Sequence, residues 1–63
     1  MKIGLDIGST TLKCVVFDDK ENMVYSEYER HFSLVREKSV EMLTRIGKEF
    51  PENKFTISIS GSA

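Results

Sequence analysis

Two charged residues flank a short polar stretch near the beginning of this 63-residue chain. Asp6 precedes the stretch and Lys13 follows it, and between them stand Gly8, Ser9, Thr10 and Thr11. Gly8 has no Cβ and can adopt a positive φ, so a ligand can approach the backbone there, and the hydroxyl and N–H groups that follow suit an anion. A carboxylate suits hydrated Mg²⁺, and an ammonium suits phosphate oxygens. The sequence therefore predicts a phosphate site, in which Asp6 is the candidate catalytic and metal-binding residue.

The same stretch also has a purely conformational explanation. Gly, Ser and Thr are common in hairpin turns, and an Asp before a turn often only accepts hydrogen bonds from nearby backbone N–H groups. Two familiar nucleotide signatures are missing, because the chain contains neither Gly-x-x-x-x-Gly-Lys-Ser/Thr nor Gly-x-Gly-x-x-Gly. A P-loop or a Rossmann dinucleotide site is therefore not supported.

The elements that must position these residues are expected to be two strands of one hairpin. Ile3, Leu5 and Ile7 alternate with polar or small residues, and residues 12–17 are rich in β-branched and aromatic side chains. This alternation makes Asp6 the last outward-facing residue of the first strand. The polar stretch is then the tight loop between the two strands.

A third strand is expected from Met23 to Phe32, after a turn cluster at residues 18–22. The two adjacent Asp residues of that cluster more often mark a solvated turn than a metal site. His31 is the only histidine and has no second ligand type at metal spacing, so we expect a polar surface position near the strand end. Three strands with short turns make an antiparallel meander, and one face of the third strand is expected to be solvated.

An amphipathic helix is predicted from Leu34 to Phe50, with Ser33 as its N-cap. One arc gathers the side expected to face the core: Val35, Ser39, Met42, Leu43, Ile46 and Phe50. The opposite arc is charged and suits solvent: Glu37, Lys38, Glu41, Arg45, Lys48 and Glu49. Within it, Glu41 and Arg45 have the spacing of an i,i+4 ion pair.

Pro51 stops the helix, and Phe55 to Ser60 has the strict alternation of a fourth strand. The intervening helix allows a crossover connection, which places the fourth strand beside the first and parallel to it. The predicted fold is therefore α/β, with a three-stranded antiparallel meander, a crossover helix and strand order 3-2-1-4.

Residues 4–19, GLDIGSTTLKCVVFDD, resemble the first phosphate-binding hairpin of the superfamily of actin, sugar-kinase and heat-shock-chaperone ATPases. Within it, the segment is most similar to the ATP-dependent activators of 2-hydroxyacyl-CoA dehydratases and benzoyl-CoA reductases. The run Ser-Thr-Thr-Leu-Lys-Cys favours an activator over a sugar kinase, whose turn is more often Gly-Thr-Thr or Gly-Gly-Thr. The predicted sheet then corresponds to a partial ribonuclease-H-like lobe.

The resemblance implies roles for the same residues. Asp6 would hold Mg²⁺ through water, the turn from Gly8 to Thr11 would wrap the β- and γ-phosphates of ATP, and Lys13 matches a lysine that activators also carry. In the full-length protein, ATP hydrolysis would be coupled to electron delivery to a CoA-linked dehydratase or reductase. Such activators are implied to carry an iron–sulfur cluster on cysteines far downstream, so this chain is not expected to bind the cluster.

Cys14 is the only cysteine and stands among apolar residues, so a small buried side chain is expected. One cysteine allows no internal disulfide, and no secretory pattern is present, so the expected compartment is a reducing cytoplasm. The net charge is −1 with acids and bases interspersed, which argues against nucleic acid or an anionic membrane as a partner.

Residues 1–63 are expected to be the N-terminal fragment of an actin-like ATPase lobe, since a chain of this size has marginal stability alone. The chain has no second phosphate hairpin, no glycine pair for adenosine and no cluster cysteines, and residues 61–63 depart from the glycine-rich turn of activators. One hairpin supplies one side of a phosphoryl-transfer site, so the isolated chain is expected to be inactive. It is also expected to self-associate, by edge pairing of fourth strands or by exchange of an element between chains. A sugar or acid kinase lobe and a non-catalytic actin-like or chaperone-like assembly module remain as alternatives.

Overall fold

The computed structural model describes residues 1–61 as one sheet and one helix. The elements follow in the order β1 (Lys2–Ile7), β2 (Thr11–Phe17), β3 (Met23–Arg30), α1 (Val35–Glu49) and β4 (Thr56–Gly61). The segment 61–63, which was expected to differ from the glycine-rich turn of activators, includes residues 62 and 63, and these two lie outside the described residues.

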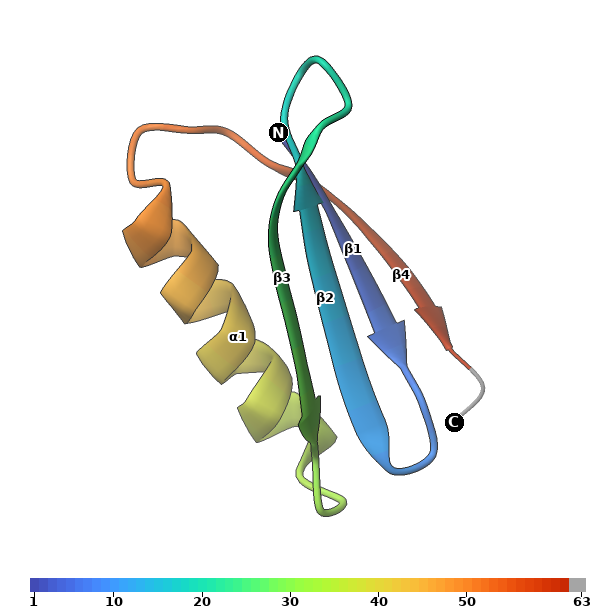
Figure 1. Ribbon diagram of the computed structural model, residues 1–63. Coiled ribbons are helices and arrows are strands. Elements are labelled where there is room, and N and C mark those ends of the chain that lie inside the picture. Colours follow the sequence, from blue (N-terminus) through green and yellow to red (C-terminus); the bar gives the residue numbers. More distant parts are fainter. Residues whose placement is uncertain (62–63) are drawn as a thin grey trace.

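The four strands form a mixed sheet in the order β3-β2-β1-β4 (Figure 1). β1 pairs antiparallel with β2, β2 pairs antiparallel with β3, and β4 pairs parallel with β1. The predicted α/β fold, meander, crossover and strand order are therefore confirmed. The ends of two strands differ from the prediction, because β3 stops at Arg30 rather than Phe32 and β4 runs one residue later, to Gly61.

The core lies between the sheet and α1, and it is built by the alternate residues of β1 and β2. Leu5 pairs with Cys14 across these strands, and both side chains are buried. The helix adds Met42 and Ile46, which are fully buried one turn apart. Together the buried apolar residues are Ile3, Leu5, Leu12, Cys14, Val16, Met42 and Ile46. The other face of β1 and β2 consequently points away from the helix.

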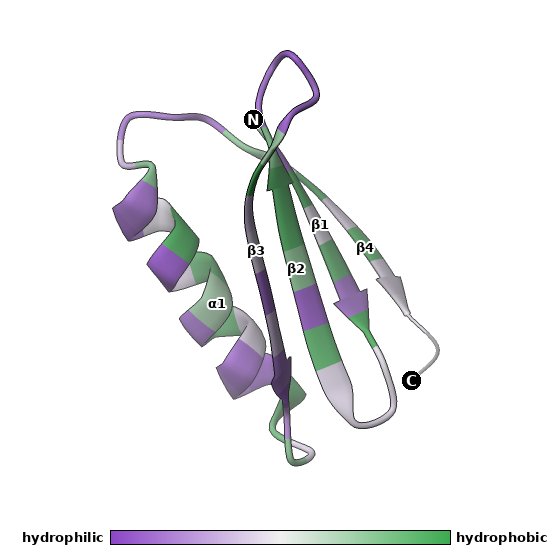
Figure 2. Ribbon diagram, viewed as in Figure 1, coloured by the Kyte–Doolittle hydropathy of each residue, from purple (hydrophilic) through white to green (hydrophobic). Residues whose placement is uncertain are grey.

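The apolar side of α1 faces the sheet, and much of its polar side faces away, as the hydropathy colours show (Figure 2). Lys38 and Arg45 differ from the expected solvent-facing arc, because both reach carboxylates of β3. The helix lies against β2 and does not extend over β4 (Figure 1). Ile57 and Ile59 pair with Ile3 and Leu5 and so share the helix-covered face, yet they remain 49% and 66% exposed. Apolar surface is therefore left uncovered on the helix side of the sheet, at β4.

The start of the helix differs from the prediction. The helix begins at Val35, its N-cap is Leu34, and no side chain caps it. Ser33 is not the N-cap, because its backbone is left-handed, with φ 65°, and its N–H donates a hydrogen bond to His31 Nδ1 at 3.0 Å. The bend before the helix therefore uses Ser33 for a different contact.

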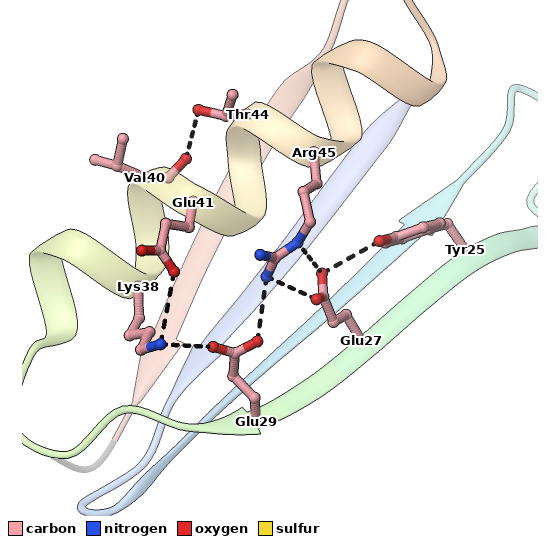
Figure 3. A network of polar contacts seen from close by, with 8 residues as sticks. All are labelled: Tyr25, Glu27, Glu29, Lys38, Val40, Glu41, Thr44 and Arg45. Carbon is pink, nitrogen blue, oxygen red and sulfur yellow. Dashed lines mark hydrogen bonds and ion pairs between the residues drawn. The ribbon is translucent and has the colours of Figure 1, made fainter.

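Ion pairs join the charged side of α1 to β3 (Figure 3). Arg45 Nη2 lies 2.6 Å from Glu27 and 3.2 Å from Glu29, and Lys38 Nζ lies 3.4 Å from Glu29. The predicted pair of Glu41 with Arg45 is wrong, since Glu41 instead lies 3.6 Å from Lys38. Arg45 turns away from its own helix because two carboxylates on β3 are within its reach. Each such partly exposed pair contributes about 0.2–1 kcal/mol.

No helix within residues 1–61 is both long enough and apolar enough to span a membrane.

Candidate phosphate-binding site

Asp6 and Lys13 face each other across β1 and β2. They are register partners in the antiparallel pair, and both are exposed on the face away from α1. Directly opposed side chains in such a pair have Cβ atoms about 4.5–5.5 Å apart. The structure therefore places the two charged residues that the sequence singled out directly opposite each other, close to the end of the hairpin that carries the turn.

Ser60 is a third polar residue at this place, and no site role was predicted for it from the sequence. It is the register partner of Asp6 on β4, and its hydroxyl donates a hydrogen bond to Asp6 Oδ1 at 3.2 Å. The predicted parallel pairing of the first and fourth strands already held the signal, because it lines up the serines of β4 with the outward residues of β1.

A hollow of about 340 Å³ lies on this face of the sheet. Its lining includes Asp6, Lys13 and Ser60, together with Gly4 and Val15. Gly4 contributes to the hollow by having no side chain, since a Cβ there would lie 3.2 Å from Val15 Cγ2. This contribution of Gly4 was not predicted from the sequence.

The turn at the end of the hairpin carries the other predicted residues. The Gly8 N–H donates to the Thr11 carbonyl at 2.8 Å, and Ser9 and Thr10 are exposed at the tip. Gly8 does not adopt a positive φ, so the conformational part of the prediction is wrong. Glycine is needed there for space, because a Cβ would lie 3.2 Å from Thr11 Oγ1 and 3.3 Å from the Thr11 carbonyl.

His31 is buried, with 4% of its surface exposed, so the prediction of a surface position is wrong. Its Nε2 lies 2.9 Å from the Gly8 carbonyl oxygen, and its backbone N–H donates to the Thr10 carbonyl at 3.0 Å. The physical reason is that β3 ends at Arg30 and the chain bends, which turns the ring inward toward the hairpin turn. Sequence alternation alone cannot reveal such a change of direction.

Two other groups with possible chemistry have structural roles. Cys14 is fully buried in the core, as predicted, and burial raises the pKa of its thiol, with a smaller contribution from the charge of Glu27. Asp18 closes the predicted turn, since its Oδ1 accepts hydrogen bonds from the backbone N–H groups of Asn22 and Lys20, each at 2.9 Å. These hydrogen bonds lower the pKa of the Asp18 carboxyl, and the bond from the Asn22 N–H has the largest effect.

The face of the sheet that carries Asp6 offers a metal ion single carboxylates rather than a cluster of ligands. Within residues 1–61, no group of three His, Cys, Asp or Glu side chains could hold a metal ion. Mg²⁺ commonly binds through one or two carboxylates and takes its other ligands from water and substrate phosphates. Asp6, exposed beside the hollow, fits that manner of binding and would not bind a bare ion tightly.

The charges and donors of this region are of the kinds that suit an anion. Lys13 supplies a positive charge beside the hollow, and the Asp6 carboxylate suits a hydrated cation there. The turn residues Ser9 and Thr10 do not line this hollow but a neighbouring one, together with His31. No protein-family model matches the chain, and no curated protein sequence matches it.

Proposed function

We propose that residues 2–17 form the phosphate-binding wall of an ATP site. Lys13 and the turn from Gly8 to Thr11 contact the β- and γ-phosphates, and Asp6 holds Mg²⁺ through water. The observation that carries the proposal is the register of the hairpin, which sets Asp6 directly opposite Lys13 on the exposed face of the sheet.

The surroundings of this pair support the proposal. Asp6 and Lys13 line a hollow rather than a flat surface, and small residues, Gly4 and Ser58, keep it open. Ser60 holds the Asp6 carboxylate by one oxygen, which leaves its second oxygen for a water of the metal. Mg²⁺, when bound, neutralises the negative charge that develops on the phosphates during phosphoryl transfer.

The resemblance of residues 4–19 extends the proposal to the whole protein. An activator of a CoA-linked dehydratase or reductase would close a second lobe over the phosphates, and ATP hydrolysis would change the position of the two lobes. Phosphoryl transfer needs an aligned nucleophile and stabilisation of the phosphate charge from several directions. This chain would provide that stabilisation from one direction. The isolated chain therefore binds nucleotide weakly and does not turn it over.

The proposal can be tested by titrating the ¹⁵N-labelled chain with Mg·ATP and following the backbone amides by NMR. The expected result is a saturable shift of the turn amides. Asp6→Asn and Lys13→Ala should each weaken binding by about tenfold, the size expected when one charge-assisted contact is lost. In the full-length protein the same variants should lower ATP turnover far more than they lower the melting temperature.

Matched controls lie at the opposite end of the sheet, in the turn between β2 and β3 and after α1. Lys20→Ala and Glu52→Gln each remove one exposed charge of the same kind. They should leave the Mg·ATP affinity within about twofold of the wild type, because exposed charges farther away than a Debye length are screened. Wild-type affinity in Asp6→Asn and Lys13→Ala, with both folded, would refute the proposed site.

A further inference from the structure

The side chain of His31 is held at both ring nitrogens. Nδ1 accepts a hydrogen bond from the Ser33 N–H at 3.0 Å, and Nε2 lies 2.9 Å from the Gly8 carbonyl oxygen. A backbone N–H can only donate, so Nδ1 carries no proton. The proton of the neutral ring is therefore on Nε2, which donates it to Gly8. This assignment links the bend after β3 to the turn between β1 and β2.

The bend that presents the ring is strained. Phe32 and Ser33 have consecutive left-handed backbones, with φ of 50° and 65°, and neither is a glycine. Each left-handed residue of this kind costs about 1–2 kcal/mol. The Leu34 N–H donates to the His31 carbonyl at 2.7 Å, which closes the bend on itself. Strain that persists next to a candidate site is a reason to ask what the bend positions there.

The bend fixes two peptide planes of the turn. His31 binds the Gly8 carbonyl through its ring and the Thr10 carbonyl through its backbone N–H. In a planar trans peptide the C=O and the following N–H point in opposite directions. The N–H groups of Ser9 and Thr11 therefore point away from His31, and they lie at the tip and base of the turn that the proposed site uses.

We infer that His31 is a positioning residue for the turn: its Nε2–H holds the Gly8 carbonyl, and thereby aims the Ser9 N–H at the phosphates of the ligand. The inference rests on the proposed function. His31 does not touch the ligand in this arrangement, and its effect is passed through the Gly8–Ser9 peptide. The buried ring cannot leave Gly8 without leaving its donor unpaired.

Two amide replacements separate this contact from the contact with Ser33. In His31→Asn the side-chain oxygen takes the place of Nδ1, so it can accept the Ser33 N–H, but the side chain is too short to reach Gly8. In His31→Gln the amide N–H takes the place of Nε2 and can reach the Gly8 carbonyl. The probes are inorganic pyrophosphate with Mg²⁺, followed through the turn amides, and ¹⁵N NMR of the imidazole ring, which reports the tautomer.

The expected ring spectrum is that of the Nε2–H tautomer. His31→Asn should weaken pyrophosphate binding by about five- to tenfold, since one buried hydrogen bond is lost, and His31→Gln should stay within about twofold of the wild type. Phe32→Ala, which truncates an exposed neighbour, should also bind normally. In His31→Asn the Ser9 amide signal should shift even without ligand.

The outcomes distinguish this inference from the proposed function. Absence of pyrophosphate and Mg·ATP binding by the wild type would overturn both. Normal wild-type binding together with wild-type affinity in His31→Asn, or an Nδ1–H tautomer in the free chain, would overturn the positioning role alone. Should His31→Asn fail to fold, weaker binding by His31→Gln than by Phe32→Ala would overturn the role equally.

Discussion

Ser60 donates a hydrogen bond to Asp6 across β4 and β1, at 3.2 Å and 54 positions apart in the chain. Ser60→Ala should therefore release the Asp6 carboxylate. We expect Mg·ATP binding to weaken by about threefold, less than in Asp6→Asn, and the free energy of unfolding to fall by about 0.5–1 kcal/mol, because the bond is exposed. Amide titration and urea denaturation measure the two effects. Thr56→Ala, on the same face at the far end of β4, is the control, and an equal loss of affinity there would refute a specific role of Ser60.

Ser39 offers a test of stability alone. It lies on the core side of α1, as predicted, and its hydroxyl is buried without a hydrogen-bond partner among residues 1–61. Ser39→Ala should raise the free energy of unfolding by about 1–2 kcal/mol, because it removes an unpaired polar group and introduces a better helix former. Val40→Ala, at an exposed helical position, measures the helix-propensity part alone. If the two variants gain equally in urea denaturation, the buried hydroxyl costs nothing.

Cys14 should react slowly with a thiol reagent in the native chain. The side chain is inaccessible, and its raised pKa leaves little thiolate, which is the reactive form. We expect labelling at least about tenfold slower than in urea. A Ser26→Cys variant adds an exposed thiol on β3, and this thiol should react rapidly in the same sample. Equal native rates for both thiols would contradict the burial of Cys14.

Asp18 should make stability fall in acid. Its folded-state pKa lies below its ordinary value because backbone N–H groups of Asn22 and Lys20 stabilise the carboxylate. Because this pKa is lower in the folded state, Asp18 contributes its full stabilisation only above the pKa that it has in the unfolded chain. That stabilisation is lost as the pH falls through the folded-state pKa, so the loss occurs below about pH 4. Urea denaturation at several acidic pH values, compared with Asp18→Asn, checks this. An unchanged pH profile in the variant would contradict the prediction.

The outer edge of β4 should promote self-association. β4 ends the sheet as the structure describes it, and Ile57 and Ile59 are exposed beside this edge. An uncovered strand edge pairs readily with another copy. Sedimentation at micromolar concentration should therefore detect dimers or larger species. Ile59→Lys places a charge at the edge and should give monomers without loss of the fold, and a monomeric wild type would refute the prediction.

The strand order was predictable because each part of it depends on local periodicity. The alternation in residues 3–7 and 55–60 marks strands, the apolar arc from Val35 to Ile46 marks a helix, and the handedness of crossovers then leaves one arrangement. The opposition of Asp6 and Lys13 follows from the hairpin register. These features need no knowledge of where any side chain meets a distant one.

Most of the contacts that were missed join distant segments. The position of His31 depends on two left-handed residues, Phe32 and Ser33, which no periodicity marks. Arg45 was assigned to Glu41 because a sequence displays pairs within one helix, whereas its partner Glu27 is 18 positions away on another element. Ser60 was overlooked for the same reason. Predictions from sequence therefore fail most where tertiary contacts compete with local ones.

The central place of β1 in the sheet has a kinetic consequence. The pairing of β1 with β2 needs only a short turn, but the pairing of β1 with β4 joins residues 54 positions apart. The pairing with β4 therefore has the larger entropic cost of loop closure. The meander should form before β4 docks, and folding should be slower than in a helical chain of equal length. Because Ser60 arrives with β4, Asp6 acquires its hydrogen-bond partner in the last step of assembly.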